Sequence, residues 1–309
     1  MILRDFGSVI FPAIHVDLKG GAAPVKEYIR TLVINTVRSY NARFRSDYGE
    51  LIICFDSRSW RQDLFPLYKW VRKQGRDNDD NDWDNIFEYI TEIQDDLREH
   101  FPFRCVSAYG AEADDSIAYL ASVSKEPTLI ISNDKDLVTL TRFGNVEQFR
   151  PFMKSKAMFT VPDPIRFEFD LICGGDEADG IPSIRCPESW FKTKFIANRD
   201  DEKIKRAPPV TVKLKNEWYE AYQQGGDDEL RKLIGEEMFM RFMMNRQLIQ
   251  FDRTPSNVID GIKKSLDAAE AAPVMKTLAF LGRNKMNLLA KEISTFKVNK
   301  TPNKTRQLF

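Results

Sequence analysis

The chain has 309 residues, of which 42% are hydrophobic, and its 46 basic and 46 acidic residues cancel to a formal net charge of zero. This length and apolar content suffice for one large folded domain plus a smaller one, or for two domains of similar size. A neutral chain has no overall basic field that would announce a nucleic-acid partner, so any such partner must be recognised by local clusters of charge.

Cysteine and histidine usage excludes further classes of protein. The cysteines lie far apart in the sequence, at Cys54, Cys105, Cys173 and Cys186, and the histidines are His15 and His100. This spacing argues against a zinc site made of Cys and His. No apolar run approaches the roughly 20 residues that span a bilayer, and the first residues lack a signal-peptide pattern. We therefore expect a soluble, cytoplasmic protein that does not associate with a membrane and keeps its thiols reduced.

Up to about residue 160, short apolar runs alternate with helical patterns. Strands are predicted at Ile2-Leu3, Leu51 to Phe55, Phe103 to Val106 and Thr128 to Ile131. Helices are predicted at Val25 to Tyr40, Trp83 to His100 and Asp114 to Val123. Strands that are apolar at every position are buried on both faces, which indicates an α/β fold with a mostly parallel central sheet flanked by helices.

A basic stripe follows the second predicted strand. Lys69, Arg72, Lys73 and Arg76 recur at helical spacing after Pro66, which is suited to the first position of a helix. Arg58 and Arg61 extend the stripe, and Trp60, Tyr68 and Trp70 offer surfaces on which bases could stack. A solvated helix face is the ordinary interpretation of such a run. The position of this stripe just after Asp56 favours contact with phosphates.

Acidic residues cluster where several predicted strands end. Asp5, Asp56 and Asp134 follow three separate strands, and the carboxyl ends of the strands are where open α/β sheets bind ligands. Two further groups are Glu112, Asp114 and Asp115, and Asp134 and Asp136. Helix capping is the alternative: it explains one acid of the first group well but three poorly, whereas for Asp134 and Asp136 taken alone it is the favoured interpretation. Convergence of so many carboxylates would be repulsive without cations, so together they favour a site for hard divalent metal ions.

The segment Gly174 to Ile184 is the most specific single string. Asp176 and Asp179 are three apart and are followed by Gly180 and a Pro-containing turn. This pattern indicates a hairpin whose backbone could grip phosphate or a monovalent cation, while an ordinary connection between two helices is the alternative.

Strand patterns fade after about Pro162, and helical patterns dominate the rest of the chain. These cover Asp227 to Phe251, Ser256 to Ala271 and Val274 to Ser294. We expect a domain boundary near residue 162, a helical second domain over residues 163–309, and a flexible basic tail from Lys297 to Phe309.

The order of these motifs resembles the phage T4-type ribonuclease H and flap endonuclease family of 5′-nucleases. The match includes Asp5-Phe6, Cys54 to Ser57, Trp60 to Lys69, Glu112 to Asp115, Ser132 to Asp136 and Gly175 to Pro182. The resemblance implies a PIN-like 5′-nuclease catalytic domain over residues 1–162 with an arch at residues 58–83. It also implies a helical DNA-binding domain with a helix-three-turn-helix element at residues 174–196.

The same resemblance implies hydrolysis assisted by two Mg²⁺ ions, for which Mn²⁺ is a possible substitute. One ion would be held by Asp5, Asp56, Glu112, Asp114 and Asp134. The second would be served by Asp115, Asp136, Asp176 and Asp179. Lys69 and Arg72 match the basic residues that stabilise developing phosphate charge, so they are the expected catalytic residues.

For contact with nucleic acid, the resemblance implicates basic residues of the arch and the turn of the hairpin. These are Arg58, Arg61, Tyr68, Lys73, Arg76, Gly180, Ser183 and Arg185. The hairpin could also hold K⁺ through backbone carbonyls and Ser183.

The expected activity is 5′ to 3′ exonuclease and flap endonuclease cleavage of RNA-DNA hybrids and duplex DNA ends. It would remove lagging-strand RNA primers during phage replication in the host cytoplasm. A single-stranded DNA-binding protein is an expected partner, a sliding clamp could bind the tail Thr305 to Phe309, and the protein is expected to be a monomer.

Two other classes compete with this interpretation. A non-catalytic junction-binding protein with the same fold would be expected to lose metal ligands, yet all nine acidic positions are present. An aspartyl-phosphate phosphatase would need Asp-x-Asp after the first strand, where this chain has Asp5-Phe6-Gly7.

Overall fold

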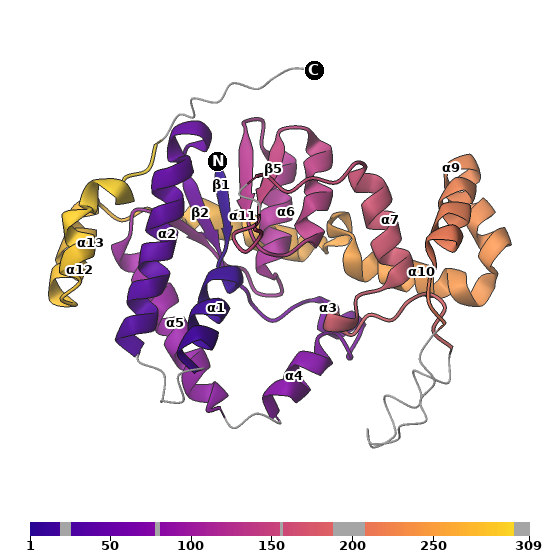
Figure 1. Cartoon of the computed structure of the whole chain (residues 1–309), viewed down its shortest axis with the longest axis horizontal. Coiled ribbons are helices and arrows are strands. Elements are labelled where there is room, and N and C mark those ends of the chain that lie inside the picture. Colours follow the sequence, from indigo (N-terminus) through magenta and orange to yellow (C-terminus); the bar gives the residue numbers. More distant parts are fainter. Residues whose placement is uncertain (19–25, 78–80, 155–156, 188–207, 300–309) are drawn as a thin grey trace. The chain divides into compact units, whose positions relative to one another are not determined.

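The computed structural model describes residues 1–18, 26–77, 81–154, 157–187 and 208–299 (Figure 1). The chain forms two compact units that are interleaved along the sequence. The first, here called the sheet unit, contains residues 1–60, 80–162 and 254–309. The second, here called the helical unit, contains residues 61–79 and 163–253.

A five-stranded parallel sheet forms the centre of the sheet unit, in the order β3-β2-β1-β4-β5. The strands are β1 Ile2–Asp5, β2 Leu51–Cys54, β3 Arg104–Val106, β4 Thr128–Ile131 and β5 Val146–Phe149. In the register, Asp5 lies opposite Cys54 of β2, and Arg4 lies opposite Ile131 of β4. The last residues of β1, β2 and β4 therefore reach the same edge of the sheet.

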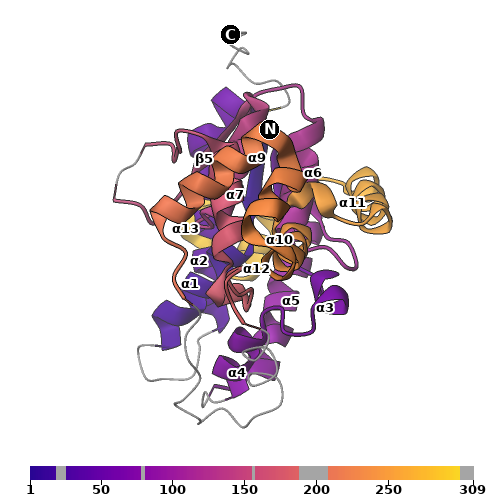
Figure 2. The same cartoon turned by 90° about the vertical axis from the view of Figure 1, so that its right-hand side faces the viewer.

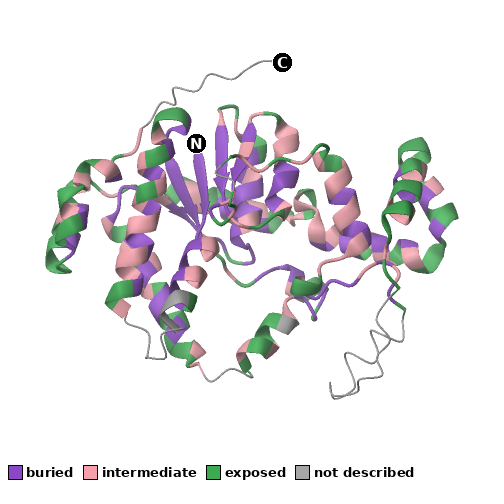
Figure 3. Cartoon of the chain, in the orientation of Figure 1, coloured by how far each residue is buried: buried purple, intermediate pink, exposed green. Residues whose placement is uncertain are grey.

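Helices cover both faces of this sheet, and the strands between them are buried (Figure 3). Residues Ile2, Ile53 and Ile131 pack in one hydrophobic core with α1 Gly7–Leu18, α2 Lys26–Tyr48 and α5 Trp83–His100. On a strand, alternate side chains point to opposite faces. The other face contacts α6 Ala113–Val123, which packs in turn against η1 Asp136–Phe143 and α11 Ser256–Ala268. This layering positions the loops that follow the strands.

The C-terminal elements of the sheet unit are α11, α12 Val274–Arg283, α13 Asn287–Lys291 and η4 Ile293–Phe296. An aromatic cluster attaches them: the ring centroid of Phe101 lies 5.3 Å from that of Phe280 and 5.7 Å from that of Phe296. These contacts explain why residues 254–309 belong with the sheet, although the sequence prediction placed them in the second domain.

The helical unit contains α3 Arg61–Leu64, α4 Trp70–Asp77, α7 Pro164–Gly174, η2 Glu177–Asp179, α9 Val212–Ile234, α10 Glu236–Ile249 and η3 Phe251–Arg253. Helices α7, α9 and α10 pack together (Figure 2) around Phe169, Trp218 and Phe242. The start of α7 is fixed by Asp163, whose side chain accepts hydrogen bonds from the amides of Ile165 and Arg166.

The structure confirms the α/β prediction and corrects several elements. Strand β5 was not predicted, because Val146–Phe149 carries polar residues that interrupt an apolar pattern. The helix expected over Asp227 to Phe251 is broken at Gly235, which has φ +80°. The helix expected over Val274 to Ser294 ends at Arg283, and Lys285 takes φ +56°.

The basic stripe is also corrected, because it does not form one helix from Pro66. Helix α4 begins only at Trp70, and Lys69 precedes it with φ +58°. The Lys69 amide donates a hydrogen bond to the carbonyl of Asp179, at 2.8 Å. This contact between distant segments overrides the helical spacing.

Among the helices of the described residues, none combines the length and the apolar character that a membrane-spanning helix requires.

Candidate functional site

Asp5 and Asp56 meet at the edge of the sheet in the sheet unit. A Cβ atom added to Gly7 would lie 3.2 Å from Asp56 Oδ2 and 3.3 Å from Asp5 Oδ1. These two oxygens are therefore at most about 6.5 Å apart, the sum of the two distances. Asp56 Oδ1 accepts a hydrogen bond from the Ala113 amide, at 2.9 Å. Because Gly7 has no side chain, no Cβ atom crowds these two carboxylate oxygens.

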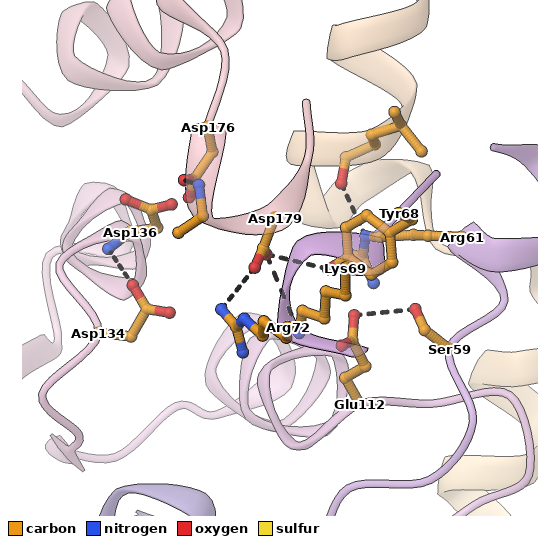
Figure 4. A network of polar contacts seen from close by, with 12 residues as sticks. Ser59, Arg61, Tyr68, Lys69, Arg72, Glu112, Asp134, Asp136, Asp176 and Asp179 are labelled. Carbon is orange, nitrogen blue, oxygen red and sulfur yellow. Dashed lines mark hydrogen bonds and ion pairs between the residues drawn. The ribbon is translucent and has the colours of Figure 1, made fainter. Parts of the chain in front are cut away.

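Ser132 connects Asp5 to the loop that carries Asp134. The buried Ser132 hydroxyl donates to Asp5 Oδ2, at 2.7 Å, and accepts from the Asp134 amide, at 3.0 Å. Buried Gln148 of β5 donates from its side-chain amide to the carbonyls of Ser132 and Asp134. Asp134 Oδ1 accepts from the Asp136 amide, at 2.9 Å (Figure 4). Asp134 thus lies just before η1, and Ser132 of the same loop connects it to Asp5.

The acids at the start of α6 are partly engaged in capping. Glu112 and Asp115 form a reciprocal capping box, in which the Glu112 amide donates to Asp115 Oδ2, at 3.0 Å. Ser59 Oγ also donates to Glu112 Oε2, at 2.9 Å (Figure 4). Asp114, between them, is half-buried. Capping therefore explains two of these three acids, more than the sequence interpretation allowed.

The negative charges of the sheet unit act on one buried thiol. Burial foremost raises the pKa of Cys54, and the carboxylates of Asp5, Asp114 and Asp56 raise it further. Among the described residues, no group of three or more His, Cys, Asp or Glu side chains is arranged to hold a metal ion. Mg²⁺ is commonly held by only one or two carboxylates plus water and substrate phosphate. The carboxylates of Asp5 and Asp56 fit that chemistry, since both supply hard oxygen donors.

In the helical unit, one carboxylate attracts three side chains of the arch (Figure 4). Asp179 Oδ1 lies 2.5 Å from Arg72 Nη2. Asp179 Oδ2 lies 3.9 Å from Lys69 Nζ and accepts from the Tyr68 hydroxyl, at 3.3 Å. The two residues expected to be catalytic are therefore both paired with an expected metal ligand.

The hairpin from Gly174 to Ile184 has the shape that the sequence predicts. Asp176 and Ile181 form an antiparallel bridge, and the Asp176 side chain accepts from the amide of Ala178, at 2.9 Å. Gly180 takes φ +75°, and a Cβ atom there would lie 2.6 Å from the carbonyl oxygen of Leu67. Only glycine allows this close approach between the hairpin and the arch segment. Residues 188–196 of the expected helix-three-turn-helix element lie outside the described residues.

The residues expected to contact nucleic acid differ in how exposed their side chains are. Arg58 and Lys73 are exposed, and Arg76 and Ser183 are half-buried. Arg61 is buried, and its Nε donates to the carbonyl of Leu248, at 2.7 Å. This contact gives Arg61 a structural role, so we do not retain it as a contact for nucleic acid. Tyr68 is buried as well, so its ring has no exposed face on which a base could stack. We therefore do not retain it as a contact for nucleic acid either.

Arg185 is half-buried, and its Nη1 donates to the carbonyl of Pro209, at 2.6 Å. The hydroxyl oxygen of Ser183 is buried and has no hydrogen-bond partner among the residues that the structure describes.

Sequence comparison places these features in a family. Residues 12–165 match the model of the 5′-3′ exonuclease N-terminal resolvase-like domain, and residues 168–296 match that of the T4 RNase H C-terminal domain. The chain is 24% identical to the ribonuclease H of Enterobacteria phage T4 over 301 residues, which cover 95% of each chain.

Solved structures agree on the fold. A bacteriophage T5 protein co-crystallised with metal ions has a TM-score of 0.50 and 17% identity, over 96% of this chain and 98% of that chain. A T5 flap endonuclease in complex with DNA and metal ions has a TM-score of 0.51, at the same identity and coverage.

The parallel sheet, the carboxylates at its edge and the helical second region define a nuclease with the 5′-nuclease fold. The chain belongs to the T4-type ribonuclease H family of 5′-3′ exonucleases and flap endonucleases. It is therefore a hydrolase of the nuclease class.

Sequence reasoning did not identify the residues that support the carboxylates. Ser132 lies within the matched residues 12–165 and Gly7 precedes them, and the roles of both depend on contacts around Asp5 at the end of β1. Arg4 could have indicated from the sequence that this strand has a special environment, because a charged residue inside a buried strand is unusual. Burial lowers the pKa of Arg4 to about 10, so the guanidinium remains positively charged at neutral pH.

Proposed function

We propose that this protein is a Mg²⁺-dependent 5′ to 3′ exonuclease and flap endonuclease that cleaves RNA-DNA hybrids and duplex DNA 5′ ends. The observation that carries the proposal is the meeting of Asp5 and Asp56 around Gly7, with Asp134 tied to Asp5 through Ser132. Three carboxylates from separate strands at the edge of a parallel sheet are suited to divalent cations and a phosphate.

Within the sheet unit, the residues proposed to hold one metal ion are Asp5, Asp56, Glu112, Asp114 and Asp134. Asp115 and Asp136 of the sheet unit are proposed to serve a second ion, and Asp176 and Asp179 are proposed to bind a cation within the helical unit. When bound, two Mg²⁺ ions would supply an activated water and neutralise charge at the scissile phosphate, and Mn²⁺ is a possible substitute. The chain's own contribution is to fix the carboxylates through Ser132 and the capping box of α6.

Lys69 and Arg72 are the proposed catalytic cations, because each can stabilise the charge that develops on a phosphate. Both are paired with Asp179, so a phosphate must compete with this carboxylate for them. A cation at Asp179 would weaken the competing ion pair. The two binding events are therefore coupled: a metal ion bound at Asp179 favours phosphate binding at Lys69 and Arg72, and bound phosphate favours the metal ion.

Contacts to the nucleic acid are proposed for Arg58, Lys73, Arg76, Gly180, Ser183 and Arg185. The Ser183 hydroxyl, which has no hydrogen-bond partner among the described residues, is consistent with a K⁺ ion at that turn. Residues 58–83 would act as the arch that admits a single-stranded 5′ end, and residues 163–253 of the helical unit as the DNA-binding region.

The proposed biological role is removal of lagging-strand RNA primers and flaps in phage DNA replication. The relative from phage T4 is named a ribonuclease H, and the T5 structure is of a flap endonuclease with DNA. We propose that the protein acts as a monomer in the host cytoplasm, with a single-stranded DNA-binding protein as partner. The sliding-clamp contact expected for Thr305 to Phe309 falls outside the described residues.

The test is cleavage of a 5′-labelled RNA-DNA hybrid and of a 5′-flap substrate, each with Mg²⁺ or with EDTA. The Asp134→Asn variant is compared with Asp267→Asn, a matched substitution on α11. We expect Mg²⁺-dependent release of short 5′ products that is lost in Asp134→Asn, with binding of the flap substrate retained. Tight flap binding without cleavage under Mg²⁺ or Mn²⁺ would overturn the proposal in favour of a non-catalytic junction-binding protein.

A further inference from the structure

Arg4 is a fully buried cation in the central strand of the sheet. Only 1% of its surface is exposed. Its Nη1 donates to the carbonyl of Ile131, at 2.7 Å, its Nη2 donates to the carbonyl of Ser8, at 3.4 Å, and its guanidinium lies 5.2 Å from the centroid of the Tyr40 ring. Within the described part of the chain, Arg4 forms no ion pair with a carboxylate. A buried charge without such a partner is costly and calls for an explanation.

The contacts of Arg4 lead to both oxygens of Asp5. Ser8, whose carbonyl accepts from Arg4, donates its amide to Asp5 Oδ1, at 3.3 Å. Ile131, whose carbonyl also accepts from Arg4, directly precedes Ser132, which donates to Asp5 Oδ2, at 2.7 Å. The Arg4 guanidinium therefore binds the backbone at Ser8 and beside Ser132, the two residues that donate to Asp5. Arg4 and Asp5 are also consecutive residues of β1.

Several acidic residues lie near Arg4, although basic residues also contact the loop of Asp134. Lys135 Nζ lies 3.1 Å from Asp136 Oδ1, and Arg150 Nε donates to the carbonyl of Asn133, at 3.0 Å. A Cβ atom at Gly7 would lie 3.2 Å from an oxygen of Asp56 and 3.3 Å from an oxygen of Asp5, and Asp134 is tied to Asp5 through Ser132. Carboxylates at this separation repel one another, and solvent screens this repulsion least at Asp5, which is buried, whereas Asp56 and Asp134 are exposed. A fixed positive charge that cannot be deprotonated at neutral pH would reduce this repulsion without occupying a coordination position.

We propose that Arg4 is a built-in counter-charge of the metal centre. It stabilises the carboxylates of Asp5 and its neighbours when no cation is bound, and it weakens the binding of divalent cations to them. The inference rests on the proposed function, because it requires that Mg²⁺ binds at these carboxylates. Arg4 is thus a positioning residue that tunes metal occupancy, and it touches neither metal nor substrate.

The test compares Arg4→Met, which keeps length but removes charge, with Arg4→Lys, which keeps the charge. Mg²⁺ binding is measured by calorimetry, and thermal unfolding is followed in EDTA and across a Mg²⁺ titration. We expect Arg4→Met to bind Mg²⁺ about three- to tenfold more tightly than the unsubstituted protein, because a like charge has been removed. We expect Arg4→Lys to stay within about twofold of it. In EDTA, Arg4→Met should unfold at a lower temperature, with most of this loss recovered by Mg²⁺.

The remaining outcomes would each reject the inference, and one of them would also reject the proposed function. Equal shifts of the Mg²⁺ midpoint in Arg4→Met and Arg4→Lys would overturn the inference, since the effect would come from lost hydrogen bonds to Ile131 and Ser8. Failure of Arg4→Met to fold even at saturating Mg²⁺ would overturn it also, because a bound cation should replace the missing charge. If the unsubstituted protein shows no Mg²⁺ binding at all, the proposed function fails with it. A normal Mg²⁺ response of that protein with unchanged variants removes only the inference.

Discussion

Arg72 and Asp179 form an ion pair with 2.5 Å between Nη2 and Oδ1, joining the arch segment to the hairpin within the helical unit. Lys69 and Tyr68 converge on the same carboxylate. An anion is thus already present where the basic residues of the arch are expected to receive a phosphate. This ion pair makes Asp179 an internal competitor of the nucleic acid.

Asp179→Asn should therefore tighten metal-free binding of nucleic acid. Without the negative charge, Arg72 and Lys69 are more available for phosphate, and binding should strengthen several-fold at low salt. The slope of log K against log salt should steepen by about one, as expected for one added phosphate contact. Fluorescence anisotropy of a labelled flap substrate in EDTA measures both quantities.

The matched control for this prediction is Asp170→Asn. It removes an ion pair between Asp170 and Arg166, 2.9 Å apart, on α7 of the same unit. The control should leave the salt slope unchanged. A slope that stays unchanged in Asp179→Asn as well would show that the ion pair does not compete with DNA.

Ser132→Ala should weaken metal binding more than it weakens the fold. The hydroxyl both donates to Asp5 Oδ2 and accepts from the Asp134 amide, so its loss frees two carboxylate-bearing segments. Outer-shell hydrogen bonds of this kind typically change metal affinity or activity by about 10–100-fold. The Mg²⁺ concentration for half-maximal cleavage should rise within that range. Ser122→Ala, which removes a hydroxyl bond on the exposed face of α6, should leave it unchanged.

Much of the fold could be predicted from the sequence because the strands are uniformly apolar. Leu51 to Phe55 and Thr128 to Ile131 were recognised within one residue of β2 and β4. Alternation of these strands with helices was enough to indicate a parallel sheet. The missed strand β5 contains Glu147 and Gln148, whose partners are a distant tyrosine and the loop after β4. Local sequence cannot reveal such partners.

Several features escaped prediction because long-range contacts override local preference. Lys69 has good helical spacing, but its amide bonds to Asp179 and its backbone is left-handed. Arg61 looks like part of a basic surface stripe, yet it is buried in the helical unit, where its Nε donates a hydrogen bond to the carbonyl of Leu248. Charge alone does not distinguish a guanidinium in solvent from one that binds a buried carbonyl.

Gly7→Ala should separate stability from metal binding. Gly7 is the first residue of α1, where alanine is a better helix former, so the free energy of unfolding should stay within about 1 kcal/mol or rise. The added methyl group would lie 3.2 Å from Asp56 Oδ2 and 3.3 Å from Asp5 Oδ1, and it should lower Mg²⁺ affinity. Calorimetric Mg²⁺ titration and chemical denaturation measure the two effects separately.

The control for this substitution is Gly282→Ala in α12, where no atom lies within 4 Å of the added Cβ. It should stabilise the helix without changing Mg²⁺ binding. Equal Mg²⁺ affinities in Gly7→Ala and Gly282→Ala would show that the space at Gly7 is not used by a cation.

The thiols should be unreactive in the folded protein and should make its stability fall at alkaline pH. Burial raises the pKa of Cys105 and of Cys173 to about 12, from an ordinary value of 9.0. Between these values the unfolded chain has lost the thiol protons that the folded chain retains. The unfolded state therefore binds fewer protons, and the free energy of unfolding decreases as pH rises through 9. At neutral pH this contribution is absent.

Two measurements check this expectation. Labelling with a thiol-specific reagent at neutral pH should proceed only at the rate of unfolding, because the reactive species is the thiolate. The denaturant midpoint should decline above pH 9, and Cys173→Ala should decline less steeply than the unsubstituted protein. Rapid labelling of Cys105 or Cys173 under native conditions would contradict their burial, and so would a pH dependence that Cys173→Ala leaves unaltered. Ser294→Ala, on η4 of the sheet unit, should leave both measurements unchanged because it alters no thiol.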